Sequence, residues 1–121
     1  DWGVPEASTA EIIGDATVRL SVTNTGVRAG KEVVQLYVRP LAPTVSRPEK
    51  ELRAFAKLSL DAGASGVAEL PLTLRDFARF CPEAGEFVAD AGKYELLLAA
   101  NAGDIRSRIT VELPQTVALG V

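Results

Sequence analysis

Hydrophobic and polar residues alternate with a period of two along most of the chain, which is the pattern of strands buried on one face. The clearest run is DATVRLSVT, in which Val18, Leu20 and Val22 alternate with polar residues. Turn-forming residues separate this run from other segments rich in Val, Leu, Ile and Tyr. Further strands are expected in residues 31–39, 51–60, 66–74, 85–100 and 105–113. We therefore expect about six or seven short strands.

Two of these segments depart from simple alternation. Leu52 and Phe55 are three residues apart, which predicts a β-bulge or a local twist within residues 51–60. Pro71 cannot donate a hydrogen bond to a sheet, so its strand is expected to present that position at an edge or a bulge.

Two later segments have patterns of their own. Residues 74–80 carry an apolar residue at every third position, which predicts one helical turn over the end of a sandwich. The last strand is expected to present four apolar residues on one face: Ile105, Ile109, Val111 and Leu113.

The spacing of the strands predicts the fold class. Turn signals recur roughly every 8–12 residues, and no helical pattern is long enough for a βαβ crossover. Tyr94 follows Gly92 at the start of a strand, as in the tyrosine corner of immunoglobulin-like sandwiches. We predict an all-β, immunoglobulin-like antiparallel β-sandwich of about seven strands in residues 15–113, with an N-terminal arm or first strand in 1–14 and a C-terminal tail in 114–121.

Composition narrows the classes of partner. The net charge is -3, with 13 Lys and Arg against 16 Asp and Glu, so the basic surface of a nucleic-acid-binding protein is not expected. No apolar run approaches the roughly 18 residues of a membrane span, and no signal peptide is visible. We expect a soluble protein without nucleic acid or membrane as a partner.

The residues needed for common catalytic and metal sites are scarce. The chain has no His and one Cys, so it can form neither an intrachain disulfide, a Ser-His or Cys-His pair, nor a Cys/His zinc site. Cys81 is expected to be a small buried hydrophobic residue. We therefore expect no metal and no cofactor. The absence of Met indicates a processed protein or a domain of a longer chain.

Four motifs occur in a fixed order along the chain: TNTGVRAGKEVVQLYVRP, SRPEKELRAFAKLSL, LTLRDFARF and GEFVADAGKYELLLAANAGDIR. Together they resemble the fibronectin type III-like domain at the C-terminus of glycoside hydrolase family 3 enzymes, mostly β-glucosidases, with β-xylosidases and related exo-glycosidases. The resemblance covers roughly residues 15–112. It departs from the family pattern at Cys81, where Asp is usual, at Phe87, where Trp is common, and around Ala99 to Gly103.

The resemblance implies a non-catalytic accessory module. In such enzymes the catalytic Asp is on a barrel, and the acid/base residue comes from another domain or loop. Glycosidases need two carboxylates roughly 5–10 Å apart across a sugar pocket, and the close pairs Glu49/Glu51 and Glu83/Glu86 merely share a strand, loop or turn. The Asp1-Trp2 dipeptide is likewise expected to be a chance match to a catalytic motif and not part of an active site. We expect no catalytic residue in this chain.

The preferred hypothesis is that the module packs on the catalytic barrel and β/α domains of a parent glycosidase and stabilises them. Charged residues are common at contacts between domains of one chain. The proposed contact residues lie in a loop before a strand and at its beginning: Arg47, Pro48, Lys50, Glu51 and Arg53.

Two other hypotheses stay open at this point. A carbohydrate-binding sandwich would use exposed aromatic rings, and Trp2 and Tyr37 are the candidates, since Phe77 and Phe80 are expected in the core. A free-standing adhesion-type sandwich is the other possibility. The sequence does not indicate the oligomeric state.

Overall fold

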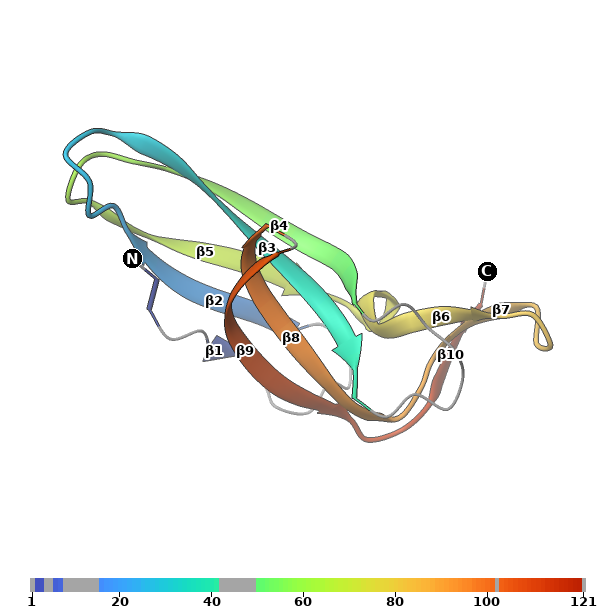
Figure 1. The fold of residues 1–121 in the computed structure, drawn as a ribbon. Coiled ribbons are helices and arrows are strands. Elements are labelled where there is room, and N and C mark those ends of the chain that lie inside the picture. The colour runs from blue at the N-terminus through green and yellow to red at the C-terminus, as the bar shows by residue number, and fades with distance from the viewer. Residues whose placement is uncertain (1, 4–5, 8–15, 42–49, 102, 121) are drawn as a thin grey trace.

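The computed structural model describes residues 2–3, 6–7, 16–41, 50–101 and 103–120. Within these described residues, two antiparallel sheets face each other (Figure 1). The strand order is β1-β2-β5 in one sheet and β4-β3-β8-β9 in the other. The expected all-β sandwich of about seven strands is thus confirmed for the described residues. The seven strands are β1 (Glu6–Ala7), β2 (Ala16–Thr23), β3 (Gly30–Pro40), β4 (Glu51–Leu60), β5 (Ser65–Leu72), β8 (Gly92–Asn101) and β9 (Asp104–Leu113).

The core lies between these two sheets and follows the alternation of the sequence. Val18, Leu20 and Val22 of β2 are buried, as are alternate residues over part of β3, β5 and β8. Tyr94 and Phe77 are the bulkiest fully buried side chains among the described residues. Full burial of one Leu or Phe side chain contributes about 1.5–3 kcal/mol, so this layer is the main source of stability.

The bulge expected between Leu52 and Phe55 is present. Leu36 of β3 pairs with Ala54 and Tyr37 pairs with Leu52, so Arg53 is the extra residue of β4. Beyond the bulge, β4 alternates again, with small or branched apolar residues packed on the core and Phe55 facing outward. The bulge therefore lets Leu52 and Phe55 both lie on the outer face of the sheet.

A second bulge makes one expectation wrong. Leu98 of β8 pairs with Ser107 of β9, but Ala99 pairs with Ile105, so Arg106 is an extra residue. Because one added residue reverses the facing of every residue before it, Ile105 leaves the face of Ile109 and the sandwich core. It packs instead against the outer side of the sheet.

The segment after β5 contains the expected edge position and helical turn. β5 is the outermost strand of its sheet, and Pro71 lies in it opposite Thr17. A 3₁₀ turn, η1 (Leu74–Phe77), follows. The turn ends at Phe77, so Phe80 is in the next strand and is 49% exposed, not in the core as expected.

A third, small sheet projects from one end of the sandwich (Figure 1). It has the order β10-β7-β6, from β6 (Ala78–Cys81), β7 (Glu86–Ala89) and β10 (Val117–Gly120). We call residues 78–89 the projecting hairpin. Residues of the expected C-terminal tail form β10, which pairs with β7. No helix within the described ranges is long and apolar enough to cross a membrane.

Candidate interdomain surface

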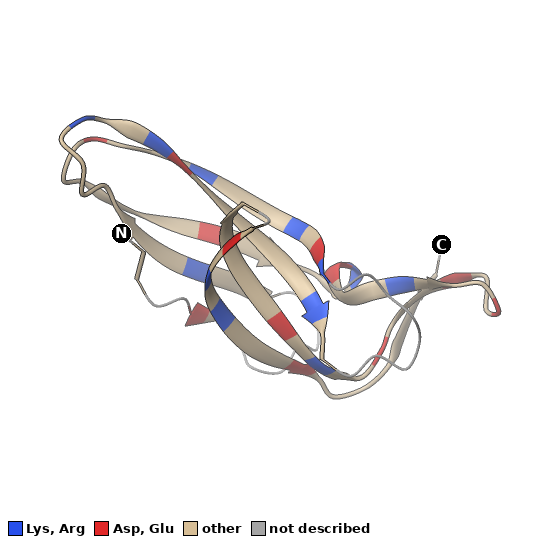
Figure 2. Ribbon diagram, in the orientation of Figure 1, with Lys and Arg blue, Asp and Glu red and all other residues tan. Residues whose placement is uncertain are grey.

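The expected contact residues are only partly within the described structure. Arg47 and Pro48 lie outside the described residues, whereas Lys50 directly precedes β4 and Glu51 and Arg53 lie at its beginning. Charges of both signs are distributed over the strands without one dominant patch (Figure 2). Charge alone therefore does not single out a contact surface.

Arg53 is engaged in contacts within the module. Its Nη2 donates a hydrogen bond to Oε2 of Glu51 at 2.7 Å and a long one to the carbonyl oxygen of Ala78 at 3.4 Å. The Arg53 side chain is half-buried, and its Nε has no hydrogen-bond partner among the described residues. Arg53 thus joins the beginning of β4 to the base of the projecting hairpin.

Apolar side chains accompany these charges on the outer face of the larger sheet. Leu52 is 48% exposed and Phe55 is 61% exposed, although both are large and apolar. The adjoining strands carry a buried cluster of Tyr37, Leu97 and Ala99, with Ile105 packed against it. We call these six residues the outer apolar face. Simple alternation does not reveal this face, because bulges in β4 and β9 place Leu52, Phe55 and Ile105 on it, and only the bulge in β4 was expected.

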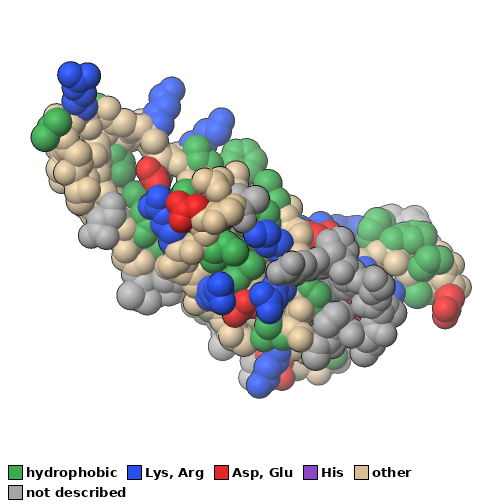
Figure 3. All heavy atoms as spheres, viewed as in Figure 1, with side chains coloured by type: hydrophobic (Ala, Val, Ile, Leu, Met, Phe, Trp, Pro, Cys, Tyr) green, Lys and Arg blue, Asp and Glu red, His purple; other side chains and the backbone are tan. Residues whose placement is uncertain are grey.

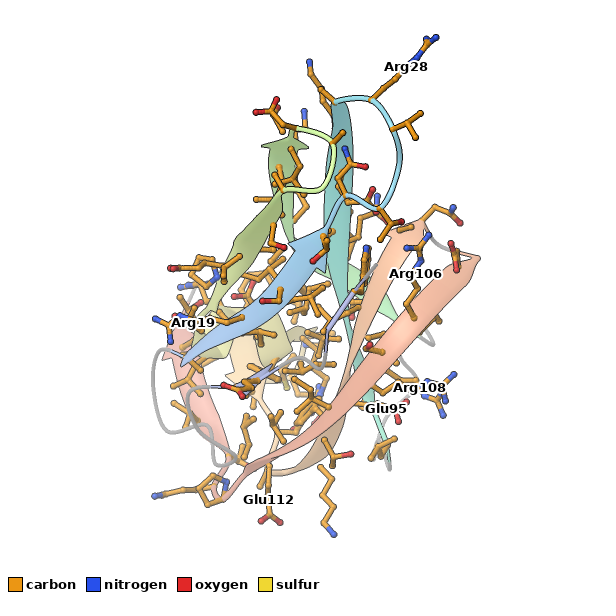
Figure 4. The ribbon with its side chains drawn as sticks, turned by 90° about the vertical axis from the view of Figure 1, so that its left-hand side faces the viewer. Arg19, Arg28, Glu95, Arg106, Arg108 and Glu112 are labelled. Carbon is orange, nitrogen blue, oxygen red and sulfur yellow. The ribbon has the colours of Figure 1, made fainter. Side chains whose placement is uncertain are left out.

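Charged residues surround the outer apolar face. Glu95 of β8 and Arg108 of β9 point outward from the sheet (Figure 4), whereas the Arg106 guanidinium lies over the Trp2 ring. Arg39 Nη1 approaches Oε1 of Glu95 at 3.8 Å, and the Lys50 Nζ lies 5.1 Å from the centre of the Tyr37 ring. An apolar centre with a charged margin is the composition expected of a contact between domains of one chain.

The two aromatic residues considered for sugar contact are both covered. Trp2 is half-buried, donates from Nε1 to Oε1 of Glu32 at 3.1 Å, and has the Arg106 guanidinium 4.7 Å from its ring centre. Tyr37 is buried and donates from Oη to Oε1 of Gln35 at 2.9 Å. A sugar ring stacks on an open aromatic face, and these contacts occupy both residues.

Tyr94 and Asp90 join the sandwich to the projecting hairpin. Tyr94 Oη donates to the carbonyl oxygen of Asp90 at 2.7 Å, the geometry of a tyrosine corner, and its ring packs edge-on against Phe77 at 5.1 Å. The Asp90 carboxylate accepts two hydrogen bonds from Arg79. These hydrogen bonds raise the pKa of the Arg79 guanidinium above its ordinary value, so the residue is charged throughout the usual pH range.

The acidic residues and the single Cys are the remaining chemically reactive side chains singled out by the sequence. The described residues contain no group of three or more His, Cys, Asp or Glu side chains that could hold a metal ion. Glu83 lies in the turn of the projecting hairpin, and Glu86 begins β7 opposite Cys81. Cys81 is a free thiol and is partly exposed, so the expectation of a buried Cys is wrong.

Comparison with known protein families identifies the family of this chain. The family model described as the fibronectin type III-like domain matches residues 32–102. The chain belongs to this family. The resemblance found in the sequence motifs is thereby confirmed. Within this fibronectin type III-like domain, the matched region runs from β3 to β8 and includes the outer apolar face up to Ala99.

Similar proteins carry the domain as a small part of a longer chain. A β-glucosidase from Rhizobium radiobacter is 55% identical over 93% of this chain, which spans 14% of that protein. Thermostable β-glucosidase B from Acetivibrio thermocellus is 34% identical over 84% of this chain, again spanning 14% of the relative. The solved structure of β-glucosidase 3B from Thermotoga neapolitana matches all of this chain and 16% of its own, with 30% identity and a TM-score of 0.89.

Proposed function

We propose that this chain is the non-catalytic accessory module of a family 3 glycoside hydrolase of the β-glucosidase type. The observation that carries the proposal is the 55% identity to a β-glucosidase of which this chain spans only 14%. A similar proportion recurs in other relatives, including probable β-glucosidase L of Emericella nidulans, of which this chain spans 12%. The catalytic groups of such a protein belong to the rest of its chain.

The module packs on the catalytic domains and stabilises them through the outer apolar face. Leu52 and Phe55 expose large apolar surfaces close to Lys50 and Glu51 in the sequence. Covering a fully exposed Leu or Phe is worth about 1.5–3 kcal/mol. Leu52 and Phe55 are 48% and 61% exposed, so each contributes roughly half of that amount, and together they stabilise a parent enzyme measurably.

The test uses the full-length parent enzyme. Removing residues 1–121 is expected to lower its melting temperature and its soluble yield. The double change Leu52→Ser with Phe55→Ser is expected to do the same in milder form. Val67→Ser is the matched control, because Val67 is 51% exposed on the outer side of the opposite sheet.

Two readouts distinguish a stabilising contact from a catalytic role. Melting temperature should fall by several degrees in the Leu52/Phe55 variant and stay unchanged in the Val67 control. Hydrolysis of an aryl β-glucoside, measured well below the melting temperature, should keep its kcat. Unchanged solubility, melting and activity after removal of residues 1–121 would overturn the proposal.

A further inference from the structure

The projecting hairpin continues the core face of the sandwich beyond its end. Ala78 of β6 pairs with Ala89 of β7, and both are buried in the main core. Two residues further along each strand, Phe80 pairs with Phe87 on the same face of the hairpin. Phe80 is 49% and Phe87 is 36% exposed, so a face that begins as core ends as uncovered aromatic surface.

The two rings form a defined aromatic pair. Their centres are 5.3 Å apart with an angle of 75° between the ring planes, an edge-to-face arrangement. Among the described residues, the Arg75 guanidinium lies 5.8 Å from the centre of the Phe87 ring. Figure 3 shows hydrophobic side chains gathered on this projecting end and an acidic side chain at its extremity.

The hairpin is held in place from several directions. β7 is hydrogen-bonded between β6 and β10, and Arg75 Nη2 donates to the carbonyl oxygen of Leu119 at 3.2 Å. The Gly85 N–H closes the turn by donating to the carbonyl oxygen of Cys81 at 2.9 Å. Because these contacts fix the aromatic pair before any partner binds, little ordering entropy is lost on contact.

Charge is separated along the same hairpin. Glu83 and Glu86 lie at its tip, and neither has an ion-pair partner within the described ranges. Arg75 lies at its base, and Arg79 is already paired with Asp90. A surface that covers the aromatic pair would therefore meet acidic side chains beyond it and would be matched by Lys or Arg at that margin.

We propose that the Phe80–Phe87 pair is a second docking point, covered by an apolar patch with a basic margin in the glycosidase part of the same polypeptide. This inference rests on the proposed function. Stable association of separate chains needs about 1,000 Å² or more of total buried surface, more than two four-residue strands provide. A tethered partner is present at about millimolar effective concentration, so a small contact suffices. The 14% share of the relative's length leaves ample chain to supply that partner.

The closing experiment places a photo-cross-linking side chain on the hairpin of the full-length parent enzyme. With Phe80→p-benzoylphenylalanine, irradiation is expected to yield cross-links to peptides outside residues 1–121, on a protein that still migrates as a single chain. Val27→p-benzoylphenylalanine is the control, because Val27 is 93% exposed at the β2–β3 turn and should give no such adduct. The charge reversal Glu83→Lys with Glu86→Lys should reduce the Phe80 cross-link yield several-fold.

The outcomes separate this inference from the proposed function. Cross-links between two copies of the chain, or none, would overturn the docking point. A parallel probe, Leu52→p-benzoylphenylalanine, reports on the outer apolar face. Cross-linking from Leu52 without cross-linking from Phe80 rejects only the hairpin contact and leaves the proposed function standing. Absence of both cross-links, together with unchanged stability after removal of residues 1–121, rejects the proposed function as well.

Discussion

Arg79 and Asp90 form a two-point ion pair at the base of the projecting hairpin. Nε of Arg79 lies 2.6 Å from Oδ2 of Asp90, and Nη2 lies 3.3 Å from Oδ1. The carbonyl oxygen of the same Asp90 accepts the hydrogen bond from Tyr94. Asp90 therefore connects β6, through Arg79, with β8, through Tyr94. The contact of its carboxylate and the contact of its carbonyl oxygen can be removed separately by substitution.

Asp90→Asn should remove the charge of the ion pair and leave the Tyr94 contact in place. We expect a loss of about 1 kcal/mol in the free energy of unfolding, because the pair is bidentate but about one-fifth exposed to solvent. Urea titration of chain 1–121 measures it. The control is Glu69→Gln, which breaks an exposed pair with Arg19 at 3.8 Å and should change stability by less than about 0.5 kcal/mol. Equal losses in the two variants would contradict the prediction.

Tyr94→Phe should remove a buried hydrogen bond and leave the Asp90 carbonyl oxygen without this donor. The expected loss is about 1–2 kcal/mol, since an unsatisfied polar group in a buried site adds to the lost bond. Tyr37→Phe is the matched control: its hydroxyl contacts the part-buried Gln35 side chain two residues away, which can turn to water. Chemical denaturation of both variants checks the difference, and a larger effect at Tyr37 would refute it.

Gly85→Ala should destabilise the turn of the projecting hairpin. Gly85 has φ of 68°, a left-handed conformation in which a side chain is disfavoured by roughly 1–2 kcal/mol. Gly30→Ala is the control, because a Cβ at Gly30 meets no atom within 4 Å and its φ lies outside that region. Hydrogen exchange of the hairpin amides should increase only in the Gly85 variant. If the hairpin amides of the Gly85 variant stay as protected from exchange as those of the unmodified chain, the turn tolerates the substitution and the prediction is wrong.

Sugar binding by the sandwich itself is tested through its two candidate aromatic residues. Because Trp2 is covered by Arg106 and Tyr37 is buried, we expect no retardation of the chain in gels containing cellulose, xylan or soluble β-glucan. Trp2→Ala should lower stability without changing this mobility, since Trp2 donates to Glu32. Retardation of the unmodified chain that disappears in Trp2→Ala or Tyr37→Ala would favour the carbohydrate-binding hypothesis.

Much of the fold follows from local patterns. The alternation of β2 correctly predicted that Val18, Leu20 and Val22 share one buried face, and the irregular spacing of Leu52 and Phe55 correctly predicted a bulge. These predictions hold because a buried face selects apolar residues at every second position and so defines the register. The order of four motifs was enough to indicate the family.

The candidate surfaces could be predicted from sequence patterns only in part. Arg53 at an interdomain contact stays a prediction, and the structure adds hydrogen bonds from Arg53 to Glu51 and Ala78 that the sequence did not indicate. Phe80 continued an apolar spacing that predicted core, but the strand carrying it runs past the end of the sandwich. A sequence records that a residue is apolar, and the length of the neighbouring strands decides whether anything covers it.

The sequence by itself determined most strands of the two facing sheets, the inward residues of β2 and the membership of the fibronectin type III-like family, because these depend on a residue's near neighbours and on ordered motifs. Only the tertiary structure decided that Ile105 faces outward, that Trp2 is covered, and that the Phe80–Phe87 pair is exposed. Each of these depends on a partner strand or side chain far away in the sequence. A single inserted residue in β4 or β9 changes the facing of a whole segment, and its place is set by pairing between strands.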